Sequence, residues 1–327
     1  MSFERIVGQS AAVETLKKRI EADSLPHALL FSGPSGVGKK TVALELARAL
    51  LCEKRTGRPC GVCAACGRAE RLSHPDLIVV SPAESGQMGI PEIRNLIGRA
   101  QLKSFSGGVK IAILDGADAL TDEAQNAFLK ILEEPPSGTY FILLASETNR
   151  LYPTILSRCQ KIGFRELETG EVKTILARDP ELGAGEAARL AERSGGSAET
   201  ALRRRDFDAA GVEDGVFRLI GEAARGDVSE LPDRGKVKRE EALFEIDAAA
   251  DLFRDLYLLK TAPEGAEKRL TFADRRAELD KLARAYPAEA IESALEAAAE
   301  ARDAVEHSAN LRMVFSGFWI ACGVKFF

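Results

Sequence analysis

A glycine-rich segment near the N-terminus has the residue types and spacing of a loop that binds phosphate groups. It reads Gly33-Pro-Ser-Gly-Val-Gly-Lys-Lys40 and fits the pattern G-x-x-x-x-G-K-[ST] at every position except the last. Gly33, Gly36 and Gly38 allow the backbone N–H groups to surround phosphates, and Lys39 can reach the β and γ oxygens. Because an apolar run precedes this segment and a helical pattern follows it, we predict a nucleotide site that takes ATP or ADP.

The residues that would bind Mg²⁺ and use it for hydrolysis are incomplete. Lys40 stands where a Ser or Thr hydroxyl normally ligates the metal ion. Thr41 does not replace that hydroxyl, because one residue along a helix is a rotation of about 100°. Asp115 ends a second apolar run, but Gly116 follows it where hydrolysing ATPases have an acidic residue that polarises water. We therefore expect neither a well-formed Mg²⁺ site nor ATP hydrolysis by the chain itself.

Four of the six cysteines lie close together in the sequence. Cys52, Cys60, Cys63 and Cys66 have the spacing C-x7-C-x2-C-x2-C. Four thiolates suit tetrahedral Zn²⁺, whereas incidental thiols in a loop are the alternative. Because four cysteine ligands leave no coordination position for a substrate, we predict a structural zinc module at residues 52–66.

The elements that must position these residues alternate between strand and helix through residues 1–165. Short apolar runs at 27–32, 77–81, 110–114 and 140–145 fit strands buried on both faces of a parallel sheet, and 160–164 adds a fifth. The clearest helix spans 121–134, with Thr121 as its N-cap and a double proline after it. The fold class expected is a doubly wound α/β domain, in which ligands bind at the carboxyl ends of the strands.

The strand signal fades after residue 165. Two short helices are expected at 168–177 and 184–193, within a small helical domain at 166–208. Residues 209–327 then read as wholly helical, with long helices at 240–260 and 288–306 and an apolar segment at 314–324. We expect the basic run Arg203-Arg204-Arg205 to lie on a solvated helix face or loop.

Composition limits the class of protein. The chain has 327 residues, enough for two or three domains, and a formal net charge of −5, which does not indicate a free-standing nucleic-acid binder. No apolar segment reaches the roughly 20 residues that span a bilayer, and the N-terminus lacks the apolar core of a signal peptide. We expect a cytoplasmic protein without a membrane partner.

Several further segments resemble, in the same order, those of bacterial clamp-loader ATPases of the AAA+ class, and most closely their delta-prime type. Together with the loop at Gly33 and the inserted cysteines, the matching segments are Phe3–Gln9, Leu25–Phe31, His74–Asp76, Asn126–Pro136 and Thr154–Cys159. The last two segments are the most specific. Taken together, all the matching segments run through the first domain, while the rest of the chain agrees only in its helical pattern.

This resemblance implies a P-loop AAA+ domain with a parallel five-stranded sheet, a small helical lid and an all-α collar. It implies a non-hydrolysing stator in a five-membered ring with gamma/tau-like motor subunits and the delta subunit, acting on the sliding clamp and primed DNA. Arg158, from Ser157-Arg158-Cys159, would be the arginine finger supplied in trans to a neighbour's ATP. At the position where motor subunits sense the γ-phosphate with arginine, this chain has Glu199. Ser146, Thr148 and Asn149 are alternatives for a polar sensor after the fourth strand.

Two rival readings remain. A gamma/tau-like motor that hydrolyses its own ATP would explain the intact Gly33–Lys39 segment but not Lys40 and Gly116. A stand-alone nucleotide-binding regulatory protein would leave Arg158 without a target, because a finger of this kind acts on another subunit's nucleotide.

Overall fold

The computed structural model describes residues 3–54, 57–83, 86–206, 209–229, 239–263, 269–306 and 310–326. The chain forms two compact units, residues 1–201 and 202–327, and the division falls inside helix α9 (Ala198–Asp206). The finer division at residues 165 and 208 stays a prediction.

The first unit is built on a five-stranded parallel sheet, as the sequence predicts. The strands are β1 (Ala28–Ser32), β2 (Leu77–Val80), β3 (Lys110–Asp115), β4 (Thr139–Ala145) and β5 (Gln160–Gly163), in the spatial order β2-β3-β4-β1-β5. All five residues of β1 are buried because β1 lies inside the sheet with helices on both faces. This burial explains why its first four residues are all apolar and do not alternate with polar ones.

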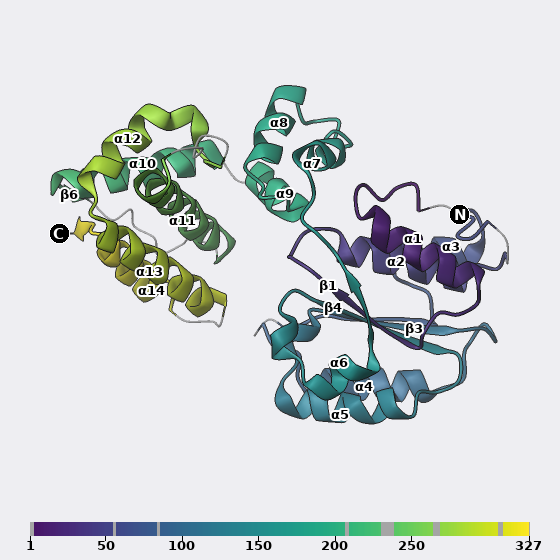
Figure 1. Cartoon of the computed structure of the whole chain (residues 1–327). Coiled ribbons are helices and arrows are strands. Elements are labelled where there is room, and N and C mark those ends of the chain that lie inside the picture. The colour runs from purple at the N-terminus through teal and green to yellow at the C-terminus, as the bar shows by residue number, and fades with distance from the viewer. Residues whose placement is uncertain are drawn as a thin grey trace. The chain divides into compact units, whose positions relative to one another are not determined.

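Helices cover both faces of the sheet (Figure 1). On one face lie α1 (Ser10–Glu21), α2 (Lys39–Leu51) and α3 (Ala64–Glu70), and on the other α4 (Ile90–Gln101), α5 (Asp122–Glu133) and α6 (Pro153–Arg158). Each face of the sheet has its own hydrophobic core, and successive side chains of β1 point alternately into the two cores. Leu29 and Phe31 belong to one core, and Ala28 and Leu30 to the other. The predicted N-cap of α5 is confirmed, since Thr121 accepts a hydrogen bond from the N–H of Ala124.

Helices α7 (Thr169–Leu176), α8 (Ala184–Glu192) and α9 follow β5. The second unit contains α10 (Ala209–Arg225), α11 (Arg239–Thr261), α12 (Arg276–Ala285), α13 (Ala288–Glu306) and α14 (Leu311–Ala321). Its core includes Phe253, Phe272 and Trp319, none of them measurably exposed. The expectation that this region is wholly helical is wrong in one detail, because β6 (Val228–Ser229) and β7 (Lys325–Phe326) pair in parallel. Strands of two residues are too short to produce a sequence period.

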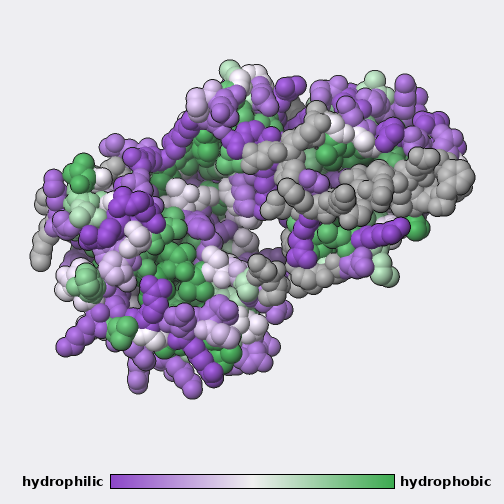
Figure 2. All heavy atoms as spheres, turned by 180° about the vertical axis from the view of Figure 1, so that it is seen from behind, coloured by the Kyte–Doolittle hydropathy of each residue, from purple (hydrophilic) through white to green (hydrophobic). Residues whose placement is uncertain are grey.

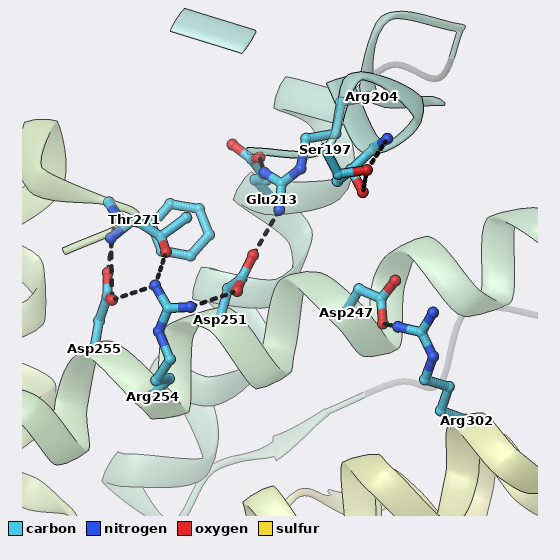
Figure 3. A network of polar contacts seen from close by, with 11 residues as sticks. Ser197, Arg204, Glu213, Asp247, Asp251, Arg254, Asp255, Thr271 and Arg302 are labelled. Carbon is cyan, nitrogen blue, oxygen red and sulfur yellow. Dashed lines mark hydrogen bonds and ion pairs between the residues drawn. The ribbon is translucent and has the colours of Figure 1, made fainter. Parts of the chain in front are cut away.

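The prediction of a solvated basic run is wrong for its middle residue. Arg204 is only 4% exposed, and its guanidinium binds Glu213 at 3.1 Å and Asp251 on α11 at 2.6 Å (Figure 3). A buried arginine needs such partners because an isolated charge in the interior is costly. The carboxylates come from 9 and 47 residues away, so no local pattern could reveal them.

Polar side chains cover most of the described surface on the face shown in Figure 2. Across the parts of the chain that the structure describes, no helix combines the length and apolar character needed to cross a membrane.

A buried carboxylate holds the loop between α4 and β3. Asp76 has no exposed surface and accepts hydrogen bonds from the hydroxyls of Ser104 and Ser106 at 3.1 and 2.7 Å. It also accepts the backbone N–H groups of Phe105 and Ser106, at 2.8 and 3.0 Å. Burial raises the pKa of Asp76, but these hydrogen bonds outweigh it and hold the pKa below the ordinary value.

Asp76→Asn should destabilise the first unit by about 2–3 kcal/mol, because an amide cannot accept all four donors and leaves buried groups unpaired. Since the folded pKa is depressed, the stabilisation from the wild-type carboxylate is fully present above the unfolded pKa and is lost as pH falls through the folded pKa. Urea unfolding at neutral and acidic pH measures both effects. Glu14→Gln, which alters an exposed carboxylate that pairs with Lys18 on the surface of α1, is the control; equal stability of the two variants would contradict the prediction.

Candidate functional site

The glycine-rich loop connects the carboxyl end of β1 to the first turn of α2. Gly36 and Gly38 have backbone φ values of 74° and 97°, which residues other than glycine rarely adopt. A Cβ at Gly33 would lie 2.3 Å from the carbonyl oxygen of Phe164, and one at Gly36 would lie 2.1 Å from the hydroxyl of Ser197. The loop is therefore a tight backbone turn against which neighbouring segments pack directly.

Lys39 turns back into this loop. Its ammonium donates to the carbonyl oxygens of Gly33 and Pro34 at 2.5 and 2.6 Å and to the hydroxyl of Ser146 at 3.0 Å. Burial lowers the pKa of Lys39, against the opposing effect of nearby carboxylates that include Asp118. Of the three alternatives for the polar sensor, Ser146 is the one that hydrogen-bonds the loop lysine.

The side chain of Lys40 forms an ion pair with Asp115. Its ammonium lies 2.8 Å from Oδ2 of Asp115, at the end of β3. A metal ion shared by a P-loop hydroxyl and this aspartate would need the place that the ammonium takes. Thr41 is exposed, in keeping with its rotation along α2. The residues present therefore do not fit a Mg²⁺ site of the usual kind.

The backbone at Gly116 also opposes a hydrolytic site. Gly116 has a φ of 82°, and a Cβ there would lie 3.1 Å from Cγ of Pro82. A glutamate at this position would be strained in backbone conformation and crowded by the proline ring. The missing acid is therefore part of a local structure adapted to glycine.

The first turn of α9 lies against the glycine-rich loop. The N–H of Ala198 donates to the carbonyl of Gly36 at 3.0 Å, and the hydroxyl of Ser35 donates to Glu199 at 3.2 Å. The carboxylate of Glu199 thus lies beside the segment that would receive nucleotide phosphates, where its charge would repel them.

Asp118 holds the turn after β4, a role that the sequence alone does not indicate. Its Oδ2 accepts the backbone N–H groups of Ser146 and Glu147 at 2.7 and 2.8 Å. It thereby fixes the turn after β4 that presents Ser146 to Lys39. The partners are 28 and 29 residues away, which is why no motif indicated the contact.

The four cysteines come together as predicted. Their sulfur atoms all lie within 4.8 Å of one another, and those of Cys60 and Cys66 are 4.0 Å apart. Around Zn²⁺ with Zn–S distances of about 2.3 Å, tetrahedral sulfurs lie about 3.8 Å apart, so the cluster is compatible with zinc. Burial raises the pKa of Cys66 to about 12, whereas backbone N–H groups of Val62 and Cys63 lower that of Cys60 to about 6.

Arg158 lies at the amino end of the parallel strands, whereas the glycine-rich loop lies at their carboxyl end. It ends α6, two residues before β5, and β5 runs parallel to β1 with Leu29 beside Gln160 and Ser32 beside Gly163. The loop follows the carboxyl end of β1, whereas Arg158 precedes the amino end of β5. Because four strand residues span about 10 Å, the backbone of Arg158 is separated from its own loop by at least that rise.

Comparison with known proteins finds similarity to subunits of DNA polymerase III. Residues 8–168 match the family described as DNA polymerase III, delta subunit. The tau subunit of DNA polymerase III from Bacillus subtilis is 31% identical over 291 residues, covering 80% of this chain and 51% of that protein. The delta' subunit from the same organism is 36% identical over 162 residues, covering 49% of this chain and 48% of that protein.

The chain thus spans about half the length of these two relatives, and both types match. A gamma subunit-related protein from Thermotoga maritima has 17% identity and a TM-score of 0.46, covering 95% of this chain and 98% of that chain.

Proposed function

Because the chain belongs to the bacterial clamp-loader AAA+ family, we propose that it is a delta-prime-like stator of the DNA polymerase III clamp loader. In this role it does not hydrolyse ATP. It supplies Arg158 in trans to ATP bound by a neighbouring gamma/tau-like motor subunit. The ring also contains the delta subunit and loads the sliding clamp onto primed DNA in the cytoplasm.

The ion pair between Lys40 and Asp115 is the observation that carries this proposal, because it separates a stator from a motor. An ammonium 2.8 Å from Asp115 neutralises the carboxylate that a motor needs for Mg²⁺. Gly116 and Glu199 act in the same direction, since one omits the acid that polarises water and the other adds negative charge beside the phosphates. ATP or ADP bound at Gly33–Lys39 would be held by the loop without metal-assisted turnover.

The position of Arg158 supports donation to another subunit. Subunits in a ring meet head to tail, so one edge of each subunit faces the nucleotide of the next. Arg158 and the glycine-rich loop of the same chain lie at opposite ends of the parallel strands, which is compatible with such an arrangement. A fixed cation at a neighbour's γ-phosphate stabilises the charge that develops as the phosphoryl group is transferred.

Zn²⁺ held by Cys52, Cys60, Cys63 and Cys66 would support the first domain by linking the end of α2 to α3. Zinc in an all-thiolate site supplies structural stabilisation and no reaction step. We propose that the second unit, residues 202–327, contributes the collar through which the subunit joins its ring.

The isolated chain should show no Mg²⁺-dependent ATPase activity, and any nucleotide affinity should be unchanged between Mg²⁺ and EDTA. Lys40→Thr removes the ammonium beside Asp115 and adds a hydroxyl, so it should make ATP affinity depend on Mg²⁺. Titration with a fluorescent ATP analogue, beside a phosphate-release assay, measures both. Lys18→Thr, at an exposed position of α1, is the matched control. Mg²⁺-dependent turnover by the wild-type chain would favour the motor reading and sink the stator proposal.

Native mass spectrometry with the partner subunits tests the stand-alone regulator. A stator should enter the ring as one copy. A stand-alone regulator would be absent from the mass of the ring, and Arg158 would then have no neighbouring nucleotide to serve.

A further inference from the structure

The short helix that carries Arg158 is attached to α5 at its beginning. The N–H of Tyr152 donates to Oε1 of Gln125 at 2.8 Å, and its hydroxyl donates to Asp122 at 2.8 Å. Gln125 is only 2% exposed and also donates through Nε2 to the carbonyl of Arg150 at 3.0 Å. The start of α6 is therefore bound by a buried amide that can accept and donate at once.

The end of α6 is attached to α5 through Arg158 itself. Nη2 of Arg158 donates to Oε1 of Glu133 at 2.8 Å, and Nη1 donates to the carbonyl of Thr154 at 3.0 Å. Among the described residues these are its two hydrogen-bond acceptors, so three of the five guanidinium N–H groups remain for another ligand. The guanidinium is thus oriented before any partner arrives.

Glu133 occupies a position where a carboxylate is electrostatically unfavourable. It is the last residue of α5, at the negative end of the helix dipole. The ion pair leaves the side chains of Glu133 and Arg158 52% and 36% exposed, so it adds little to folding stability. A glutamate at this position therefore favours neither helix formation nor folding stability. Orientation of the Arg158 guanidinium does account for it.

We propose that Glu133 is a positioning residue that orients Arg158 for the neighbouring subunit's nucleotide. This inference rests on the proposed finger role. An arginine side chain loses considerable rotamer freedom when it is fixed, and a planar guanidinium that is already oriented loses less on meeting a phosphate. The carboxylate fixes one edge of the guanidinium and leaves the remaining N–H groups for the phosphoryl oxygens.

The test is the clamp- and primed-DNA-stimulated ATPase rate of the reconstituted ring. We expect Glu133→Gln to lower kcat about tenfold at the nucleotide that Arg158 serves, and so to remove most of that site's share of the ring's turnover, with little change in KM, because misorientation of a catalytic group affects the transition state more than substrate binding. Glu133→Asp should give an intermediate rate. Glu134→Gln, which removes the adjacent carboxylate that does not contact Arg158, should match wild type.

The double variant Glu133→Gln/Arg158→Ala should be no slower than Arg158→Ala alone, because Glu133 acts through the arginine. The inference is overturned if Glu133→Gln equals Glu134→Gln or exceeds wild type, or if it slows the ring further when Arg158 is absent. Native mass confirms that each variant enters the ring. If Glu133→Gln has no effect while Arg158→Ala slows the ring, only the positioning role of Glu133 fails. If Arg158→Ala has no effect either, the finger role of Arg158 fails as well.

Discussion

Arg158→Ala should abolish hydrolysis at the neighbouring nucleotide that it serves, and so remove at least that site's share of the stimulated ATPase activity of a reconstituted clamp loader. Lys39→Ala in the same subunit should leave the activity nearly intact. An arginine finger contributes about 10³–10⁵ in rate at the nucleotide it serves, because it meets charge that spreads over the phosphoryl group. Lys39 belongs to a loop whose metal position is taken by the ion pair of Lys40 with Asp115, so its removal costs no turnover. Steady-state phosphate release with clamp and primed DNA measures both variants.

Arg178→Ala is the matched control, because Arg178 is an exposed arginine just after α7 and lies outside the glycine-rich loop and α6. If Lys39→Ala removes a full subunit's share of turnover, the chain hydrolyses ATP and the motor reading is correct. If Arg158→Ala matches Arg178→Ala, the arginine serves no neighbour. Native mass of each ring separates a loss of catalysis from a loss of assembly.

Removal of zinc should unfold the segment around the four cysteines. Binding at a structural zinc site contributes roughly 10 kcal/mol on the scale of zinc-finger peptides, and residues 52–66 contain little apolar core to replace it. Incubation with a strong chelator, or Cys66→Ser, should make this segment sensitive to limited proteolysis. Native mass should show one Zn²⁺ per wild-type chain and none after chelation.

Cys159→Ser is the control for this experiment, because Cys159 lies outside the cluster and the variant should keep one Zn²⁺. Equal protease resistance of the segment before and after chelation would show that the cysteines pack without a structural metal. The cluster would then be a set of neighbouring thiols whose proximity has another cause.

Much of the first unit could be predicted because its signals are local. The parallel sheet follows from apolar runs such as that of β1, and the cap of α5 follows from Thr121 and the residues after it. The glycine-rich loop and the cysteine cluster are equally local, since the members of each lie within fifteen positions of one another. The short pairing of β6 with β7 was missed because each strand has two residues and its partner is about a hundred positions away.

By itself, the sequence determined the parallel sheet, the glycine-rich loop, the four clustered cysteines and the departures from a hydrolytic site at Lys40 and Gly116. Residue type and short-range spacing carry that information. Only the tertiary structure decided which charges meet. It paired Lys40 with Asp115, Arg158 with Glu133, and buried Arg204 with Glu213 and Asp251. These partners are up to 75 residues apart, and the choice among many available carboxylates depends on which helices and strand ends packing brings within a few ångströms.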